Sequence, residues 1–188
     1  MNRELLREAT EWRLISLLFT PPEKGWKKEI TALASEVQDQ QLKNAAIAAC
    51  QEGDEALYHT LLGPGGMLSP RAVGHGPGMV PGKMLAQLKG FYEAFAYSPS
   101  LKEPPDHVAV MTDFVAYLRL KQALGDPKQA HTAARASMEF IREHLRSLAD
   151  SLAEAVEQCQ LRYLSLATKA LLGRVAGVQG RNLDMKTP

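Results

Sequence analysis

The sequence predicts an all-α, single-domain helical bundle of about seven to nine helices. Apolar residues recur at three- and four-residue steps in almost every patterned segment, which is the period of an amphipathic helix. No segment of any length alternates apolar and polar residues as a half-buried strand does, and no internal repeat is found. Prolines, glycines and capping residues divide the helical pattern into separate segments, as in a bundle with short connections.

The first third of the chain contains four predicted helices. Thr20-Pro21-Pro22 ends the first, because proline removes a backbone donor and clashes with the preceding turn. Gly53 closes the third helix, and Asp54 is placed to cap the fourth with its carboxylate. In order, these helices cover residues 2–19, 23–37, 41–50 and 54–62.

The remainder of the chain contains four more predicted helices. Gly125-Asp126-Pro127 ends one helix and starts the next, with proline at the first helical position. Ser151 and Glu154 have the spacing of a capping box, which predicts a break and the start of a last helix. In order, these helices run from about 82 to 95, from the segment 103–107 to about 123, from 127 to 148 and from 151 to 172. We expect residues 1–174 to form the domain and residues 175–188 a flexible tail, because glycines and polar residues dominate from Gly173 onward.

Composition excludes several functional classes. The 22 Lys+Arg and 21 Asp+Glu residues give a net charge of +1 without a basic stripe, so we expect no nucleic-acid partner. The N-terminus lacks a signal-peptide core, and no apolar run approaches the ~20 residues that span a bilayer, so we expect no membrane insertion. Cys50 and Cys159 have no metal-ligand spacing, which favours buried thiols in a reducing compartment. We therefore expect a cytoplasmic protein.

Residues 61–82 form an unusual segment that holds seven of the 14 glycines and four of the 11 prolines. A phosphate-binding P-loop requires a preceding strand and Ser or Thr after Gly-Lys, but Met84 follows Gly82-Lys83 here. The dinucleotide-binding pattern also fails, because Met79 stands where the third glycine is needed. A segment this long is typical of either a binding loop or a plain exposed connection, and both interpretations stay open.

The second unusual segment is Glu103-Pro104-Pro105-Asp106-His107. Prolines and acidic residues fit the first turn of a helix, where backbone N–H groups lack intrahelical partners and the helix dipole is positive. A histidine beside a carboxylate can also titrate near neutral pH, so an acid–base role for Asp106 and His107 is an alternative to capping. The five histidines show no metal-ligand spacing, so we expect neither a metal nor a cofactor.

The glycine-rich segment is followed along an all-helical chain by the segment 103–107, and in this arrangement the sequence resembles the TorD/DmsD/NarJ family of redox-enzyme maturation chaperones. Members of that family often carry an aromatic residue, a G-P-G loop with a nearby proline, and later E-P-x-D-H at a helix start. The matching residues here are Tyr58, Gly63-Pro64-Gly65, Pro70 and Glu103-Pro104-Pro105-Asp106-His107. A later aromatic followed by H-L, also frequent in the family, is matched by Phe140 and His144-Leu145.

The resemblance implies a non-catalytic chaperone for the apo catalytic subunit of a molybdopterin oxidoreductase. Such a protein binds the twin-arginine signal peptide of its client and assists cofactor insertion before export. The client-binding and signal-binding residues implied here are Tyr58, Gly63, Pro64, Gly65, Pro70, Glu103, Pro105, Asp106 and His107.

In this interpretation, Glu103 and Asp106 accept charge-assisted hydrogen bonds from the arginines of the signal peptide. Arg71 departs from the family pattern, and we expect it to oppose an incoming arginine pair. Two other functions stay open, a helical adaptor whose glycine-rich loop is only a connection and a small enzyme that uses Asp106 and His107. The long loop makes either a monomer or a domain-swapped dimer feasible.

Overall fold

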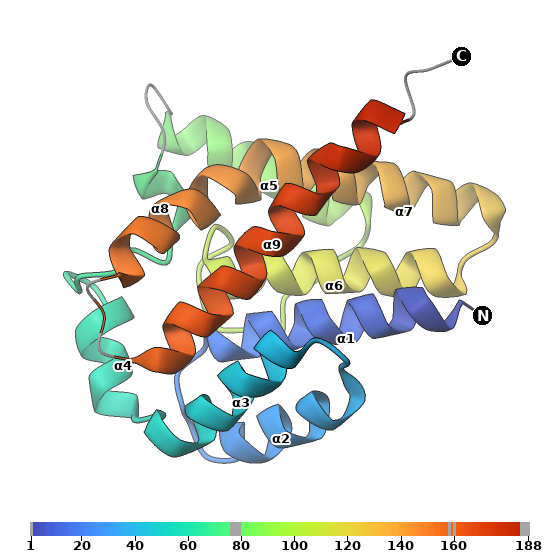
Figure 1. Ribbon diagram of the computed structural model, residues 1–188. Coiled ribbons are helices and arrows are strands. Elements are labelled where there is room, and N and C mark those ends of the chain that lie inside the picture. The colour runs from blue at the N-terminus through green and yellow to red at the C-terminus, as the bar shows by residue number, and fades with distance from the viewer. Residues whose placement is uncertain (1, 76–79, 158, 160, 185–188) are drawn as a thin grey trace.

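The computed structural model describes residues 2–75, 80–157, 159 and 161–184, with side chains described up to residue 177. This part of the chain folds into an all-α bundle, as the periodicity predicts, with no strand beyond one isolated β-bridge (Figure 1). Gly76, Pro77 and Gly78 of the glycine-rich segment lie outside the described residues. The α-helices are α1 (Arg3–Leu18), α2 (Trp26–Glu36), α3 (Gln40–Glu52), α4 (Glu55–Leu62), α5 (Pro81–Ala94), α6 (Val108–Leu124), α7 (Pro127–Phe140), α8 (Arg146–Val156) and α9 (Arg162–Asp184).

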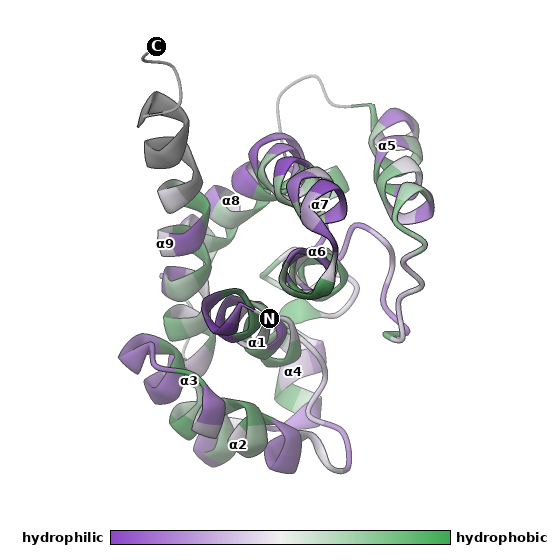
Figure 2. Cartoon of the chain, turned by 90° about the vertical axis from the view of Figure 1, so that its right-hand side faces the viewer, coloured by the Kyte–Doolittle hydropathy of each residue, from purple (hydrophilic) through white to green (hydrophobic). Residues whose placement is uncertain are grey.

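Helices α1 and α6 lie side by side at the centre of the bundle (Figure 2). Helix α6 is apolar on nearly every side, which is typical of a helix with neighbours all around it. The two helices are also joined by polar contacts. The Ser16 hydroxyl donates to the Ala109 carbonyl at 2.8 Å, and Arg13 pairs with Asp113 at 2.6 Å. Helices α2 and α3 cover one side of this central pair and α7 the other.

The end of α1 anchors α2 and α4. The indole N–H of Trp26 donates to the Leu17 carbonyl at 2.8 Å, and the Tyr58 hydroxyl donates to the Phe19 carbonyl at 2.9 Å. Asp54 caps α4 by accepting the Leu57 N–H at 2.8 Å, as the sequence predicts. Tyr58 is therefore fixed at the base of the glycine-rich segment, although that segment is remote from α1 in the sequence.

Helix α5 occupies one edge of the bundle, on the opposite flank from α9 (Figure 2). Aromatic rings attach it to the rest of the domain. The Tyr92 and Phe114 ring centroids are 4.8 Å apart, and those of Phe91 and Phe140 are 5.4 Å apart. We call this group the aromatic cluster; its members are Phe91, Tyr92, Phe95, Tyr97, Phe114 and Phe140.

The predicted helix break at Ser151 is wrong. Residues 127–156 form one helical path in which a π-helical segment, Ile141–Leu145, joins α7 to α8. Leu148, Leu152 and Val156 follow one another at four-residue steps and are all buried. Burial of this continuous apolar face outweighs the local capping preference of Ser151, so the chain turns only after Val156.

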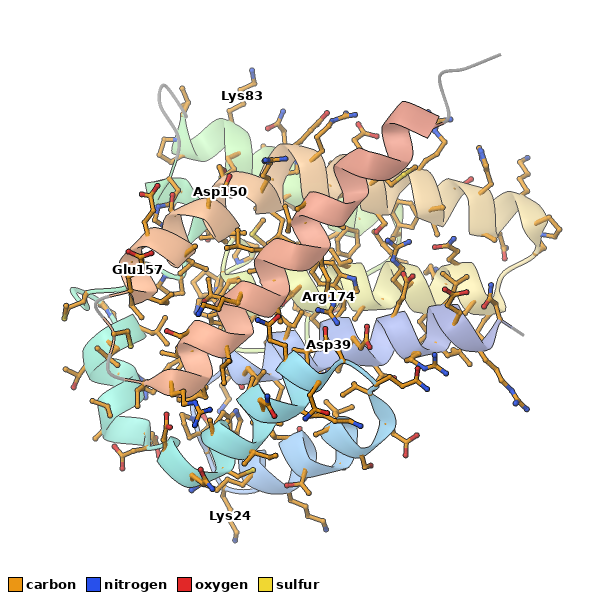
Figure 3. The ribbon with its side chains drawn as sticks, in the orientation of Figure 1. Lys24, Asp39, Lys83, Asp150, Glu157 and Arg174 are labelled. Atoms are coloured by element: carbon orange, nitrogen blue, oxygen red, sulfur yellow. The ribbon has the colours of Figure 1, made fainter. Side chains whose placement is uncertain are left out.

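Helix α9 begins at Arg162 and continues to Asp184, beyond the Gly173 at which the sequence pattern fades. One Arg174 amino group donates to both Glu11 and Asp39 at 2.9 Å, so it joins α9 to α1 and to the start of α3 (Figure 3). Val175 is buried in the core. The boundary between the domain and a tail stays a prediction. No helix among the described residues is long and apolar enough to cross a lipid bilayer.

Candidate functional site

A pocket of about 480 Å³ lies where the glycine-rich segment meets α4 and the segment before α6; we call it the loop pocket. Seven of the nine predicted site residues line it: Tyr58, Gly63, Pro64, Gly65, Pro70, Glu103 and His107. Pro105 and Asp106 do not line it. The other lining residues are His59, Leu62, Gly66, Leu68, Ser69, Arg71 and Pro104, and of these Arg71 was expected at the site only as a charge opposing the ligand. Of these, Leu62 lies one helical turn after Tyr58, so its place in the pocket follows from the period of α4.

The two glycines of Gly63-Pro64-Gly65 have structural reasons to be glycine. Gly63 ends α4 by donating its N–H to the His59 carbonyl at 3.0 Å, and a Cβ atom there would lie 2.3 Å from the same oxygen. Gly65 has a φ of +81°, in the left-handed region that side chains disfavour. The loop therefore turns sharply enough to form one wall of the pocket.

Backbone hydrogen bonds attach the glycine-rich segment to the residues before α6. The Ala72 N–H donates to the Asp106 carbonyl at 2.9 Å, and the Val108 N–H donates to the Pro70 carbonyl at 2.8 Å. These bonds form an antiparallel bridge between Arg71 and His107. The bridge explains why residues far apart in the sequence line the same pocket.

Asp106 is fully buried beneath the loop pocket. The Arg71 Nε and Nη2 atoms donate to one carboxylate oxygen of Asp106 at 3.0 and 2.8 Å, and the Val73 N–H donates to the other at 3.2 Å. An incoming arginine therefore finds no exposed surface on Asp106, contrary to the expectation of a direct contact. The pairing also neutralises Arg71, so the expected repulsion of an arginine pair loses its electrostatic basis.

His107 is the N-cap of α6, so the prolines and Asp106 precede the helix and do not occupy its first turn as predicted. Its Nδ1 accepts the Ala109 N–H at 3.2 Å. Burial lowers the pKa of His107 to about 4; the positive charge of Arg71 also lowers it, and Asp106 opposes this effect. The ring is therefore neutral at pH 7.

Glu103 is the acidic residue that the pocket leaves accessible. Its side chain is 28% exposed, and its Oε2 lies 3.8 Å from His107 Nε2. Because the imidazole is neutral, this contact does not neutralise the carboxylate. Glu103 can therefore attract a cationic group that enters the pocket.

Tyr58 and Pro105 have positioning roles. Burial raises the pKa of the Tyr58 hydroxyl, and the nearby negative charge of Glu103 raises it further, so Tyr58 stays protonated. The Pro105 carbonyl accepts the Tyr92 hydroxyl at 2.7 Å and so connects the segment before α6 to α5. Tyr58 forms a wall of the pocket, and Pro105 lies outside it.

The geometry does not favour acid–base chemistry by Asp106 and His107. Asp106 bonds to Arg71 and Val73, whereas His107 bonds to the backbone of α6, so neither side chain orients the other. A pKa of about 4 is also far from that of a general base at neutral pH. Within the described ranges, no group of three or more His, Cys, Asp or Glu side chains is placed to hold a metal ion.

Acidification is expected to remove stability through His107. Its pKa is depressed on folding, so the unfolded chain takes up a proton first, and stability falls as the pH decreases from about 6.5 to about 4. The loss from this residue amounts to about 3 kcal/mol at the acid end. His107→Asn keeps a capping side chain but does not titrate. Urea unfolding of both proteins from pH 8 to pH 4 measures the difference.

The stability of His107→Asn is expected to rise relative to that of the wild type only below pH 6.5. His144, whose pKa is also lowered by burial, is present in both proteins and cancels in the comparison. Parallel stability curves for the two proteins across this range would contradict the burial of a neutral His107.

Comparison with known proteins gives one family. The sequence model of the nitrate reductase delta subunit matches residues 26–154, which is more than half of the chain and includes every residue that lines the loop pocket. No curated protein and no solved structure gives a significant match.

Proposed function

Because this chain belongs to the nitrate reductase delta subunit family, whose members are molybdoenzyme maturation chaperones, we propose that it serves one molybdopterin oxidoreductase. In this proposal the chain is cytoplasmic and non-catalytic. It binds the apo catalytic subunit and its twin-arginine signal peptide, and it assists cofactor insertion before export. The observation that carries the proposal is the loop pocket, which collects predicted site residues from segments far apart in the sequence.

The loop pocket has the chemistry to bind an apolar peptide that contains arginine. Pro64 and Pro104 line the pocket and keep accessible apolar surface for aliphatic side chains of the peptide, whereas Tyr58, Leu62 and Leu68 are buried in its wall. Glu103 accepts a charge-assisted hydrogen bond from a guanidinium group, because the His107 imidazole beside its carboxylate is neutral and leaves the negative charge available. Asp106 and His107 act indirectly in this proposal, since they hold the loop and the start of α6 in place.

The glycine-rich segment suits a binding site that accepts more than one peptide conformation. Met67 extends from the loop with 66% of its surface exposed, and methionine adapts readily to irregular apolar surfaces. Ordering the loop around a peptide costs conformational entropy, so we expect moderate affinity.

Co-purification identifies the client. The tagged chain is isolated from its own cells, and the proteins that accompany it are identified by mass spectrometry. We expect the catalytic subunit of a molybdopterin oxidoreductase, and we expect that enzyme to lose activity when the chaperone gene is deleted. Recovery of no such subunit, together with unchanged enzyme activity in the deletion strain, would reject the proposal.

Glu103→Gln is expected to weaken binding of the N-terminal peptide of that subunit by about tenfold, because the acceptor of the guanidinium hydrogen bond loses its negative charge. Isothermal titration calorimetry measures the effect. Glu36→Gln is the matched control, since Glu36 is exposed at the end of α2 and outside the loop pocket. Equal affinity of the Glu103 variant and the wild type would show that Glu103 does not contact the peptide.

A further inference from the structure

A second depression, separate from the loop pocket, is lined by residues of α5, α7 and the π-helical segment that follows α7; we call it the α5–α7 groove. It has a volume of about 580 Å³ and shares no lining residue with the loop pocket. The residues that line it are Gln87, Gly90, Phe91, Ala94, Phe95, Thr132, Arg135, Ala136, Glu139, Glu143 and His144. Its apolar part consists of the half-buried rings of Phe91 and Phe95 and of small residues, and polar side chains such as Gln87 and Arg135 lie around it.

Gly90 has no packing role in the isolated chain. It lies inside α5, where glycine costs about 1 kcal/mol relative to alanine. A Cβ atom at this position would meet nothing within 4 Å, so no neighbour requires a glycine. Its small size, with that of Ala94 and Ala136, leaves room for another backbone to approach closely.

His144 supplies an independent observation that points to a ligand. It lines the groove, only 4% of its surface is exposed, and its Nε2 has no hydrogen-bond partner among the described residues. Its ring packs edge-on against Phe91 and Phe140, with centroids 5.5 Å away in each case. A buried polar atom without a partner costs about 1–3 kcal/mol, and a group bound in the groove can offset this cost.

The charges of the groove select the orientation of an occupant. Arg135 and Glu139 line the groove four residues apart, so they place a positive and a negative charge along it. Glu143 follows four residues later, but its carboxylate pairs with Arg142 at 2.8 Å. Both glutamates lie close enough to His144 to act on its ring electrostatically. A helix that places a basic residue and its positive N-terminus at the glutamate end complements this arrangement. Apolar residues of the same helix would cover Phe91 and Phe95.

We propose that the α5–α7 groove binds an amphipathic helix from the mature part of the client catalytic subunit. This inference rests on the proposed function and adds a second contact surface to it. The groove and the loop pocket are joined through α5, so one client can contact both. Tyr92 of α5 donates its hydroxyl hydrogen to the Pro105 carbonyl, and Pro105 is adjacent to the residues that line the pocket. A client held by its N-terminal peptide is thereby brought close to α5.

Gly90→Leu tests the proposal by filling the groove. The probe is the catalytic subunit recovered by co-purification, expressed without its N-terminal segment so that it cannot use the loop pocket. We expect the variant to bind this probe at least about tenfold more weakly than the wild type, measured by biolayer interferometry. Its Tm should be unchanged or higher, because leucine favours the helix, and its affinity for the N-terminal peptide should be unchanged.

Two further variants sharpen the test. Gly82→Leu is the matched control, since Gly82 also lies in α5 with open space at its Cβ position but does not line the groove. Glu139→Lys reverses an exposed charge of the groove without touching the core, and we expect it to weaken binding as Gly90→Leu does.

The outcomes separate the two proposals. If Gly90→Leu binds the truncated subunit as tightly as the wild type does, the groove inference is wrong. It is also wrong if the wild type binds the N-terminal peptide but does not bind the truncated subunit. Failure of the full-length subunit, the truncated subunit and the peptide alike overturns the proposed function, and the groove inference with it.

Discussion

Asp106→Ala is expected to lower the free energy of unfolding by about 2–4 kcal/mol. The substitution leaves the Arg71 guanidinium and the Val73 N–H without the carboxylate that they share, and it opens a small cavity at a fully buried position. Breaking a fully buried ion pair usually costs about 3–5 kcal/mol. We expect a somewhat smaller loss here, because the Arg71 side chain is 43% exposed and water can hydrate it once the carboxylate is gone. Urea unfolding at pH 7, followed by circular dichroism, measures the loss.

Arg71→Ala provides the partner in a double-mutant cycle. That change leaves a buried carboxylate with one backbone hydrogen bond, so it also destabilises the fold. The double variant is expected to lose less than the sum of the two single losses, because the pair then disappears together. Strictly additive losses would show that the two side chains do not interact in solution.

Phe114→Ala is expected to cost about 3–5 kcal/mol, because a fully buried phenylalanine leaves a large cavity. Within the aromatic cluster, Phe114 contacts Phe91 and Tyr92 of α5, and Phe95, which directly follows α5. Since α5 is attached largely through these rings, its amides should exchange faster than those of the other helices. Hydrogen–deuterium exchange with mass spectrometry measures this difference.

Leu118→Ala is the matched control for this effect. Leu118 is equally buried and lies one turn further along α6, but it is not a member of the aromatic cluster. We expect a loss of about 2–5 kcal/mol without selective exposure of α5. If both variants raise exchange in α5 equally, the aromatic cluster does not determine how α5 is attached.

The fold followed from the sequence where its signals are local. Asp54 caps α4 as predicted, because a capping side chain bonds to backbone groups two or three residues away. Helix α7 also begins at Pro127 as predicted, and the structure adds that Asp126 caps it. Ser151 has the same kind of local signal, but the apolar face of α8 continues through it and buries Leu152 and Val156. The local capping preference and the burial of the apolar face compete there, and burial keeps the helix continuous.

The candidate site followed from the sequence only in part. Tyr58, Glu103 and His107 were predicted to act together, and the structure places all three around one pocket. The pairing of Arg71 with Asp106 was missed because it depends on how the loop aligns with the start of α6, which no local pattern determines. For the α5–α7 groove, the signal was Gly90 in the interior of a predicted helix.

The unequal burial of the two acidic residues at the loop pocket has a consequence for ionic strength. Asp106 has no exposed surface, whereas the Glu103 side chain is 28% exposed. Dissolved ions screen charges over about 8 Å at physiological salt, and they screen buried pairs much less than accessible ones. Added salt therefore weakens the attraction of Glu103 for a cationic ligand while the Arg71–Asp106 pair persists. The pocket keeps its shape under conditions in which an electrostatically held peptide leaves it.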